Sequence, residues 1–367
     1  MLKEIEIIGL FGEMDIKVPL TGKNSISKDS EVVILIGENG SGKTTILNII
    51  NDVLNSNLFS PFNIKFEKIN LITSKETVSI TSEFINKINE LFRETLKFNY
   101  KMVKKLLEYK KDSNFIEKFL NNLDDKNTKL EYLIMLENKN LITQFMDLFE
   151  KLKQISSNNI FYPTYRRIEK EVLESESTKN IYFGMNDIEK LIEDYILKLK
   201  NFSSIGYEEI KEVLENKDLD KIEEITKRIE KNKKVEFNKL NNFVIVCNKY
   251  LFNKKIIFIS EKFEWYIEKR SKKRVNLNNL SSGEKQMVSI FAQLYLKDDK
   301  DLIILFDEPE LSISLEWQKM LIPDMLKSNK IKQLIVATHS PFIFDDEELF
   351  KNTIDIDDYT TYSTDNE

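Results

Sequence analysis

Apolar and polar residues alternate along the first twenty positions of the chain. A glycine-containing turn interrupts the alternation between residues 2 and 20, and a continuous β-branched run, EVVILIG, follows at residues 31–37. Alternation with period two is typical of a strand that buries one face, whereas a continuous apolar run is typical of a strand buried on both faces. These patterns predict a hairpin, then a buried strand, and another short strand pair near residues 66–80.

The apolar period becomes helical at about residue 84. Apolar residues recur at helical spacing from Phe84 to Phe92, and helices rich in lysine, glutamate and asparagine are expected to about residue 158. The run NNIFYPTY at 158–165 interrupts them with a predicted strand. A second helical stretch follows, and its apolar stripe from Ile188 to Leu199 is typical of ordinary helix packing.

Polar, turn-forming residues are expected to break this second helical stretch. FSSIG at 202–206 and ENKDLD at 215–220 interrupt the pattern before coiled-coil heptads accumulate. The insertion is therefore predicted to be a compact lid or short arm and not a long rod. The polar, acidic residues after about 350 predict a frayed tail.

These patterns predict an α/β protein with a split head. Residues 1–83 and 241–350 are expected to form two lobes built on a mixed sheet, with an antiparallel hairpin at the N-terminus. Residues 84–240 are expected to be a long, mostly helical insertion, crossed by a head strand near 158–167. Residues 351–367 would be a polar tail. A chain of 43.4 kDa is large enough for such an arrangement.

Composition limits the class of protein and its surroundings. With 41% hydrophobic and 32% charged residues, the chain is expected to be globular, and its net charge of -6 argues against wholesale attraction to nucleic acid. Cys247 is the single cysteine and is expected to be a buried small hydrophobe, which suits a reducing compartment. No apolar stretch approaches the ~20 residues of a membrane helix, so a cytoplasmic protein without membrane contact is predicted.

A glycine-rich loop, GENGSGKT, follows the strand EVVILI and opens the apolar helix TTILNIINDVL. Glycines let backbone N–H groups wrap phosphates next to a helix N-terminus, while Lys43 would meet the β- and γ-phosphate oxygens and Thr44 would ligate Mg²⁺. The residues expected to bind the cofactor ATP here are Gly37, Glu38, Asn39, Gly40, Ser41, Gly42, Lys43, Thr44 and Thr45.

Polar residues also end two apolar strands near the C-terminus. LIILFDEPE places Asp307 and Glu308 at a strand end, where Asp307 can hold Mg²⁺ and Glu308 can act as the catalytic base for the attacking water. The single histidine, His339, ends the strand QLIVATHS and would hydrogen-bond the γ-phosphate or the attacking water. If both strands run parallel, these groups lie at the same sheet edge.

The segment LSSGEKQ at 280–286 opens another predicted helix, MVSIFAQLYL. Ser281, Ser282, the Gly283 backbone and Glu284 would then face an anion together with the helix dipole. Taken alone, the segment is better explained as a helix N-cap formed by Ser282 and Glu284. The phosphate loop and the two strand-end motifs favour nucleotide contact over a simple cap.

Together the four motifs resemble the Walker A, signature, Walker B and switch-histidine motifs of ABC-type ATPases of the AAA family, including the SMC-, RecF- and OLD-like members. The resemblance covers about residues 1–55 and 240–345. It implies an ABC-type head that binds ATP and Mg²⁺ in a head-to-tail dimer or higher ring, with Ser312–Leu315 exchanged between subunits. Leu280 follows Thr44 by 236 positions, which is too far for a transporter ATPase.

Four longer strings are similar to compact anti-phage ATPases. YPTYRRIEKE, LSSGEKQMVSIFAQLYL, EPELSISLEWQKMLIPDML and ATHSPFIFDDEELF resemble above all the AriA-like subunit of PARIS systems, and also the PtuA-like and OLD-like ATPases. The AriA-like resemblance implies a ring of ATPase subunits that holds a separate Toprim-type nuclease effector and releases it when a phage-encoded trigger is sensed. This chain would then be the sensor and holder.

Some features leave alternatives open. Gln144 and Gln154 lie in helical text, so neither can be assigned as the usual Q-loop ligand, and Arg166 and Arg167 could reach phosphate or form an ordinary surface pair. The basic run KRSKKR at 269–274 is best explained as the solvated tip of a hairpin. The rival function is a RecF-like or SMC-like DNA-clamping ATPase, and a third is a nucleotide-gated scaffold with negligible turnover.

Overall fold

The computed structural model describes residues 1–23, 30–55, 64–94, 138–155, 158–164, 185–215 and 219–362. Its contacts divide the chain into two compact units. The first unit comprises residues 1–24, 32–159 and 352–367, and the second comprises residues 25–31 and 160–351. The helical stretch expected at 84–240 is therefore divided between the two units.

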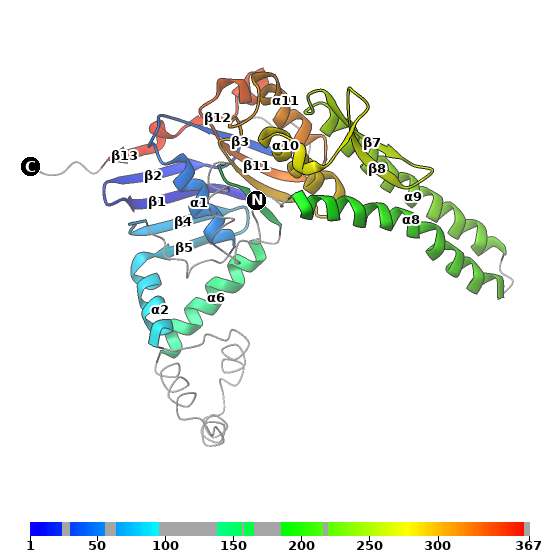
Figure 1. Ribbon diagram of the computed structural model, residues 1–367. Helices are drawn as coiled ribbons and strands as arrows, with labels where there is room; N and C mark the ends of the chain where they lie inside the picture. Colours follow the sequence, from blue (N-terminus) through cyan, green and yellow to red (C-terminus); the bar gives the residue numbers. More distant parts are fainter. Residues whose placement is uncertain are drawn as a thin grey trace, which may run out of the picture. The chain divides into compact units, whose positions relative to one another are not determined.

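The first unit contains an antiparallel five-stranded sheet (Figure 1). The expected N-terminal hairpin and the strand pair near residues 66–80 are both confirmed. Alternation directs one face of β1 and β2 inward, so that Ile5, Ile7, Ile16 and Val18 are fully buried. In the order β13-β2-β1-β4-β5 the strands are β13 (Thr360–Tyr362), β2 (Met14–Pro19), β1 (Leu2–Leu10), β4 (Lys68–Thr73) and β5 (Thr77–Thr81).

The apolar run at residues 31–37 forms the predicted buried strand β3 (Glu31–Ile36), which pairs in parallel with β12 (Thr353–Asp355). The expectation of a frayed tail after residue 350 is wrong for residues 353–362. Ile354 and Ile356 are buried there, and β12 and β13 complete the ladders of β3 and β2. Paired backbone and two buried isoleucines outweigh the polar composition of this segment.

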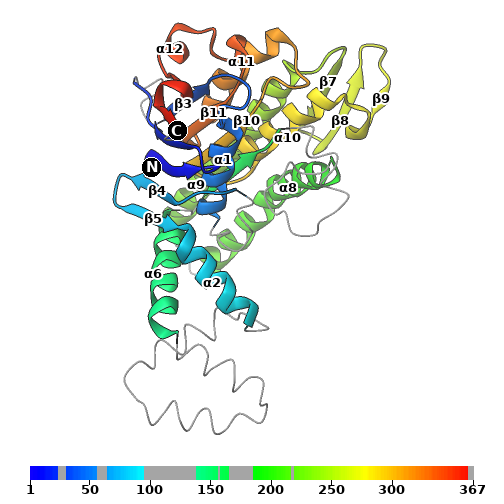
Figure 2. The same cartoon turned by 90° about the vertical axis from the view of Figure 1, so that its left-hand side faces the viewer.

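Three α-helices lie in the described residues of the first unit. They are α1 (Lys43–Leu54), α2 (Ser82–Glu94) and α6 (Lys139–Ile155). Both views show α2 and α6 running away from the β4–β5 edge of the sheet, and they contact each other and β5 (Figures 1 and 2). The helical pattern predicted from residue 84 is confirmed for these segments, and the expected helices between residues 95 and 137 lie outside the described residues.

Three strands of the second unit lie side by side in one sheet, in the order β11-β10-β6. They are β6 (Asn159–Tyr162), β10 (Leu302–Asp307) and β11 (Ile331–Ala337), and β10 and β11 are parallel as expected. Every residue of β10 is buried, in agreement with its continuous apolar sequence. The helix predicted to open at LSSGEKQ is α10 (Ser282–Leu296), and a further helix, α11 (Leu315–Leu326), follows β10.

Two long helices, α8 (Met185–Glu215) and α9 (Leu219–Asn248), pack on each other and on α10 (Figure 1). The break expected at FSSIG is wrong, because α8 continues through residues 202–206 without interruption. One glycine costs a helix only about 1 kcal/mol, less than packing along a neighbouring helix supplies. At ~1.5 Å per residue each of these two helices is roughly 45 Å long.

Charged side chains tie these two helices to the loop that precedes β10. Lys198 of α8 and Lys239 of α9 both pair with Asp298, and both also pair with Glu236. The hydrogen bond from Lys198 is the main cause that lowers the pKa of Asp298 to about 2. Because Asp298 is largely exposed, each pair contributes little, and the cluster serves mainly to fix how the helices meet the loop.

A small antiparallel sheet completes the second unit. It consists of β7 (Lys254–Ile259), β8 (Glu264–Lys269) and β9 (Arg274–Val275), and the basic run lies in its predicted hairpin turn. The remaining short elements are η1 (Leu277–Asn279), η2 (Pro341–Phe344), α12 (Glu347–Phe350) and, in the first unit, η3 (Ile356–Tyr359). Cys247 is fully buried in α9, as expected, and burial raises the pKa of its thiol. Among the described helices, none is long and apolar enough to cross a membrane.

Candidate functional site

The glycine-rich loop connects β3 to α1 in the first unit. Gly40 and Gly42 have φ values of 91° and 94°, in the region that side-chain-bearing residues rarely adopt. A Cβ at Gly40 would meet nothing within 4 Å, so backbone conformation and not space requires glycine there. Gly42 is the N-cap of α1, and the first turn, KTTI, carries no acidic residue. The positive end of the helix dipole is therefore left for an anion.

Lys43 is folded back over this loop. Its Nζ donates to the carbonyl oxygens of Gly37 at 3.0 Å and Glu38 at 2.7 Å, and to Ser41 Oγ at 3.3 Å. The residue is only 5% exposed. The loop thus concentrates a buried cation, backbone N–H groups and a helix N-terminus within a few residues, which is an arrangement suited to a phosphate chain.

The other residues expected to contact phosphate lie directly before and after Lys43 in the chain. Glu38, Asn39 and Gly40 are exposed at its tip, while Thr44 and Thr45 are half-buried in the first turn of α1.

In the second unit, Asp307 ends β10 and is 2% exposed. Its Oδ2 accepts a hydrogen bond of 2.5 Å from Thr164 Oγ1, a residue that follows β6. A bond this short is typical of a hydroxyl that donates to a carboxylate. Sequence reasoning missed Thr164, because only the placement of β6 beside β10 brings it to Asp307.

Glu308 stands in a strained conformation, with φ at 46°. For a non-glycine residue this left-handed conformation costs roughly 1–3 kcal/mol and persists only where surrounding contacts enforce it. The Glu308 N–H donates to the carbonyl oxygen of Ala337 at 2.8 Å, which joins it to the end of β11. The strain therefore lies at the residue expected to be the catalytic base.

His339 follows β11 and is exposed. Because Asp307 pairs with Ala337 in the parallel ladder, the expectation that the polar ends of β10 and β11 share one sheet edge is confirmed. A second carboxylate, Glu310, accepts hydrogen bonds from the His339 N–H at 2.9 Å and from Thr338 Oγ1 at 2.7 Å. The sequence signal for Glu310 was its place in FDEPE, two positions after Glu308.

The segment expected to face a nucleotide begins α10 with a capping box. Ser281 Oγ accepts from the Glu284 N–H at 3.3 Å, and the Glu284 carboxylate accepts from the Ser281 N–H at 2.8 Å. The cap residue is Ser281, so the N-cap expected at Ser282 lies one position earlier. Ser281 and Ser282 are exposed.

Glu284 itself is almost fully buried and faces inward. Its carboxylate accepts hydrogen bonds from Lys254 Nζ at 2.8 Å and from the Phe252 N–H at 3.0 Å. Burial alone would raise the pKa of Glu284, but these bonds outweigh it and the pKa is lowered. Its carboxylate is therefore committed to holding β7 against the start of α10.

Gly283 lies against the loop that leads from β10 to α11. A Cβ at this position would come within 2.1 Å of the Ser312 carbonyl oxygen, so no larger residue fits without backbone movement. Ser312 has a φ of 73°, and with Leu315 it is exposed. The LSSGE segment and the loop expected to be exchanged between subunits are thus in direct contact within the same unit.

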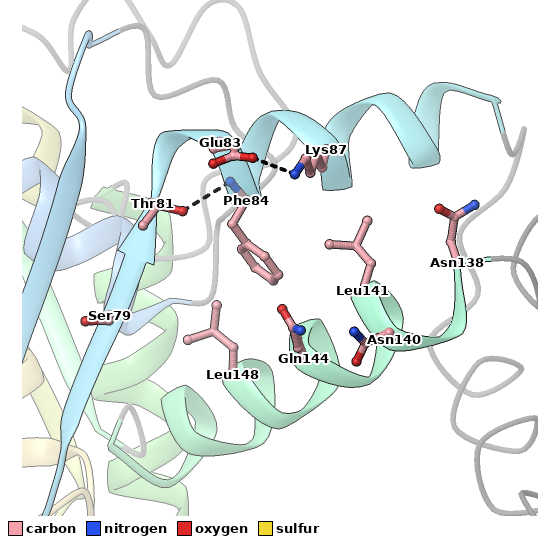
Figure 3. A pocket seen from close by; sticks show the side chains of 10 residues that line it. All are labelled: Ser79, Thr81, Glu83, Phe84, Lys87, Asn138, Asn140, Leu141, Gln144 and Leu148. Carbon is pink, nitrogen blue, oxygen red and sulfur yellow. Dashed lines mark hydrogen bonds and ion pairs between the residues drawn. The ribbon is translucent and has the colours of Figure 1, made fainter.

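A cavity of about 630 Å³ lies elsewhere, between α2 and α6 of the first unit (Figure 3). Gln144 projects into it from α6, facing Phe84 of α2. None of the residues expected to bind nucleotide lines this cavity. Its lining residues are Ser79, Thr81, Glu83, Phe84, Lys87, Asn138, Asn140, Leu141, Gln144 and Leu148. Gln154 is exposed on α6, and Arg166 and Arg167 lie outside the described residues.

Each unit contains one of the two oxygen donors expected to hold Mg²⁺, Thr44 in the first unit and Asp307 in the second. Mg²⁺ prefers hard oxygen donors and usually takes only one or two protein ligands, with phosphates and waters completing the shell. The Thr44 hydroxyl and the Asp307 carboxylate are such donors. Within the described part of the chain, no group of three or more His, Cys, Asp or Glu side chains is placed to hold a metal.

Comparison with solved structures finds SMC heads. One is the "Crystal structure of the SmcHead bound to the C-winged helix domain of ScpA", at 12% identity and a TM-score of 0.41, covering 99% of this chain and 96% of that chain. Another is the Pyrococcus furiosus Smc head domain with an extended coiled coil, bound to the C-terminal domain of ScpA. It has 15% identity and a TM-score of 0.39, and the match covers 99% of this chain and 95% of that chain.

Comparison of sequences identifies the family. A relative in Vibrio cholerae serotype O1 biovar El Tor, "Retron Vc95 probable ATPase", is 24% identical over an alignment of 366 positions that covers 86% of this chain and 67% of the relative. The family model described as "AAA domain, putative AbiEii toxin, Type IV TA system" matches residues 32–345, and that span includes all four nucleotide motifs. Because the match covers most of the chain, this protein belongs to that family of AAA-type ATPase domains.

Proposed function

We propose that this protein hydrolyses ATP with Mg²⁺, at a site completed by a second subunit. The observation that carries the proposal is the phosphate loop, with its left-handed glycines, its buried Lys43 and the N-terminus of α1, whose first turn carries no acidic residue. Membership of an AAA-type ATPase family supports the same reaction.

Each residue has a proposed role in that reaction. The N–H groups of residues 37–45 and Lys43 bind the phosphates, and Thr44 and Asp307 hold Mg²⁺, which neutralises charge that develops on the phosphates. Glu308 orients and deprotonates the attacking water. His339 hydrogen-bonds the γ-phosphate or that water.

Ser281, Ser282 and Gly283 cover the triphosphate held by the neighbouring subunit, in a head-to-tail dimer or higher ring. Glu284 supports them by capping α10. The exposure of both serines and of Ser312 and Leu315 is consistent with this role.

We infer an anti-phage role, in which nucleotide state controls a separate Toprim-type nuclease and a phage-encoded trigger releases it. Two observations support this role. Four extended strings resemble ATPases of anti-phage systems, and one relative bears the name "Retron Vc95 probable ATPase". The long α8 and α9, which both contact α10, offer a route from the nucleotide site to a partner.

Two measurements test the proposal. Phosphate release from ATP is measured for the purified protein and for Glu308→Gln, with and without Mg²⁺, and phage plaques are counted on cells that carry the gene, Glu308→Gln or neither. Turnover that requires Mg²⁺ and Glu308, together with fewer plaques only for the intact gene, is expected. Equal plaque counts in all three strains would remove the anti-phage role, and absence of turnover would leave only a nucleotide-gated scaffold.

A second candidate function, DNA clamping, rests on the hairpin between β8 and β9. Lys269, Arg270 and Lys273 are exposed there, and Arg274 stacks on Tyr266 at 3.9 Å from the ring centroid. If the hairpin binds duplex DNA, binding weakens steeply with salt and falls when Lys272, Lys273 and Arg274 are neutralised together. No binding at low salt would exclude this candidate.

A further inference from the structure

Glu310 connects the loop after β10 to the segment that carries His339. One carboxylate oxygen accepts from the main-chain N–H of His339 and the other from the hydroxyl of Thr338. Thr338 is fully buried, so loss of its acceptor would leave a buried hydroxyl poorly satisfied. The imidazole is exposed, so Glu310 acts on the backbone from which it projects.

A second tie joins the same two segments. Gln318, on the first turns of α11, accepts a hydrogen bond of 2.6 Å from Ser340 Oγ and donates to the Ile313 carbonyl oxygen at 3.3 Å. The Ser340 N–H donates to Thr338 Oγ1 at 3.0 Å, which continues the chain of bonds back to Glu310. Hydrogen bonds therefore connect the segment 310–313 to the segment 338–340, directly through Glu310 and indirectly through Gln318.

The same loop also touches the start of α10. Ser312, between Glu310 and Ile313, lies so close to Gly283 that its carbonyl occupies the space of a side chain. A displacement of Ser312 would therefore also move Glu310 and, through its hydrogen bonds, the main chain of His339.

We propose that Glu310 is a positioning residue: it sets the main chain of His339 and makes the placement of the imidazole depend on the Ser312 loop. The inference rests on the proposed role of His339 in hydrolysis. Nothing in the reaction requires Glu310 to touch the substrate, so its effect is expected to reach the rate through His339.

The kinetic test compares Glu310→Ala with the conservative Glu310→Gln, which keeps one acceptor oxygen and one donor of similar shape. We expect Glu310→Ala to lower kcat by roughly 10- to 100-fold with little change in KM, and Glu310→Gln to recover most of it. In a His339→Ala background the same alanine substitution should change kcat less than about twofold. Glu316→Ala, an exposed carboxylate on the first turn of α11, is the matched control.

A second readout does not depend on turnover. His339 is the only histidine, so ¹³C-histidine labelling gives a single imidazole signal in the full chain. Glu310→Ala should shift or broaden that signal, whereas Glu316→Ala should leave it unchanged. If the alanine variant does not fold, Glu310→Asp, with its carboxylate withdrawn by one methylene, is expected to give the same effects in smaller measure.

The outcomes separate the inference from the proposed function. If the wild-type protein shows no turnover, the proposed hydrolysis fails, and the imidazole signal alone decides the role of Glu310. An unchanged signal, or an equal loss of kcat with and without His339, would overturn the positioning role while leaving ATP hydrolysis in place.

Discussion

The loop at residues 37–42 and the carboxyl ends of β10 and β11 are both expected to act on one triphosphate, but different forces hold them in shape. In the loop, the shape is set by backbone conformation and by hydrogen bonds from Lys43 to carbonyl oxygens five and six positions away. At the strand ends, side chains distant in sequence hold Asp307 and His339. The phosphate loop is thus shaped by residues that are close in sequence. The carboxyl ends of β10 and β11, in contrast, depend on residues that only the fold brings together.

The largest effect is expected at Glu308. Glu308→Gln removes the base while keeping the side chain's size, so kcat should fall by roughly 10²- to 10⁴-fold with nucleotide affinity retained. Phosphate release and fluorescent-nucleotide titration measure the two quantities, and Glu316→Gln serves as the control. Full turnover by the Glu308 variant would mean that the base is another residue.

Lys43→Ala tests the opposite side of the comparison. Loss of the buried ammonium should weaken ATP binding by at least ~100-fold, about 2.8 kcal/mol, so that binding is no longer detected at ordinary concentrations. Equilibrium titration with a labelled nucleotide measures the loss. Lys75→Ala, an exposed lysine between β4 and β5, should bind as the wild type does. Comparable affinity in both variants would show that the loop does not bind the phosphates through Lys43.

Gly283→Ala sharpens the comparison, because here the strand-end region also depends on a glycine. The added Cβ would clash with the Ser312 carbonyl oxygen, so the free energy of unfolding should fall by ~1–3 kcal/mol. Denaturant unfolding without nucleotide measures it, with the exposed neighbour Ser282→Ala as the control. An unchanged midpoint would mean that this contact is not maintained in solution.

Thr164→Val removes the hydroxyl that holds Asp307 and keeps the shape of the side chain. The apparent Mg²⁺ affinity in the ATPase assay should fall by ~10-fold, as is usual when a partner that orients a metal ligand is lost. Thr164→Ser keeps the hydroxyl and should retain most of the affinity. If valine and serine behave alike, the hydrogen bond to Asp307 has no part in metal binding.

The smallest effect is expected in the pH dependence of stability at Glu284. Because the folded protein lowers its pKa below the ordinary value of 4.5, ionised Glu284 stabilises the fold above about pH 4.5, and this stabilisation is lost as pH falls through the lowered pKa. Wild type should therefore exceed Glu284→Gln in the free energy of unfolding at pH 7, with the difference shrinking below pH 4.5. Denaturant titrations at several pH values measure the trend, and a constant difference would contradict it.

The sequence predicted those parts of the fold whose determinants are consecutive. Alternation located β1 and β2, the continuous apolar runs located β3, β10 and β11, and the motif placed Lys43 at the start of α1. The sequence also placed Ser281–Glu284 at the start of α10. It did not predict the ion pair between Glu284 and Lys254, because a helix-capping glutamate and a nucleotide-contacting glutamate occur in the same sequence pattern.

The failures have a common physical cause. Thr164 and Asp307 are 143 positions apart and His339 and Glu310 are 29 apart, so only the sheet reveals these pairs. The continuity of α8 through Gly206 and the strands within residues 353–362 were missed because packing and ladder pairing overrode local composition.

Strands β12 and β13 have a consequence for synthesis on the ribosome. They pair with β3 and β2, which are made more than three hundred residues earlier, and Asp355 lies beside Gly37 at the mouth of the phosphate loop. While the nascent chain lacks residues 353–362, β2 and β3 each miss a neighbour, and such distant pairings form late. The sheets that contain β2 and β3, beside the phosphate loop, can therefore be completed only after residues 353–362 have been synthesised.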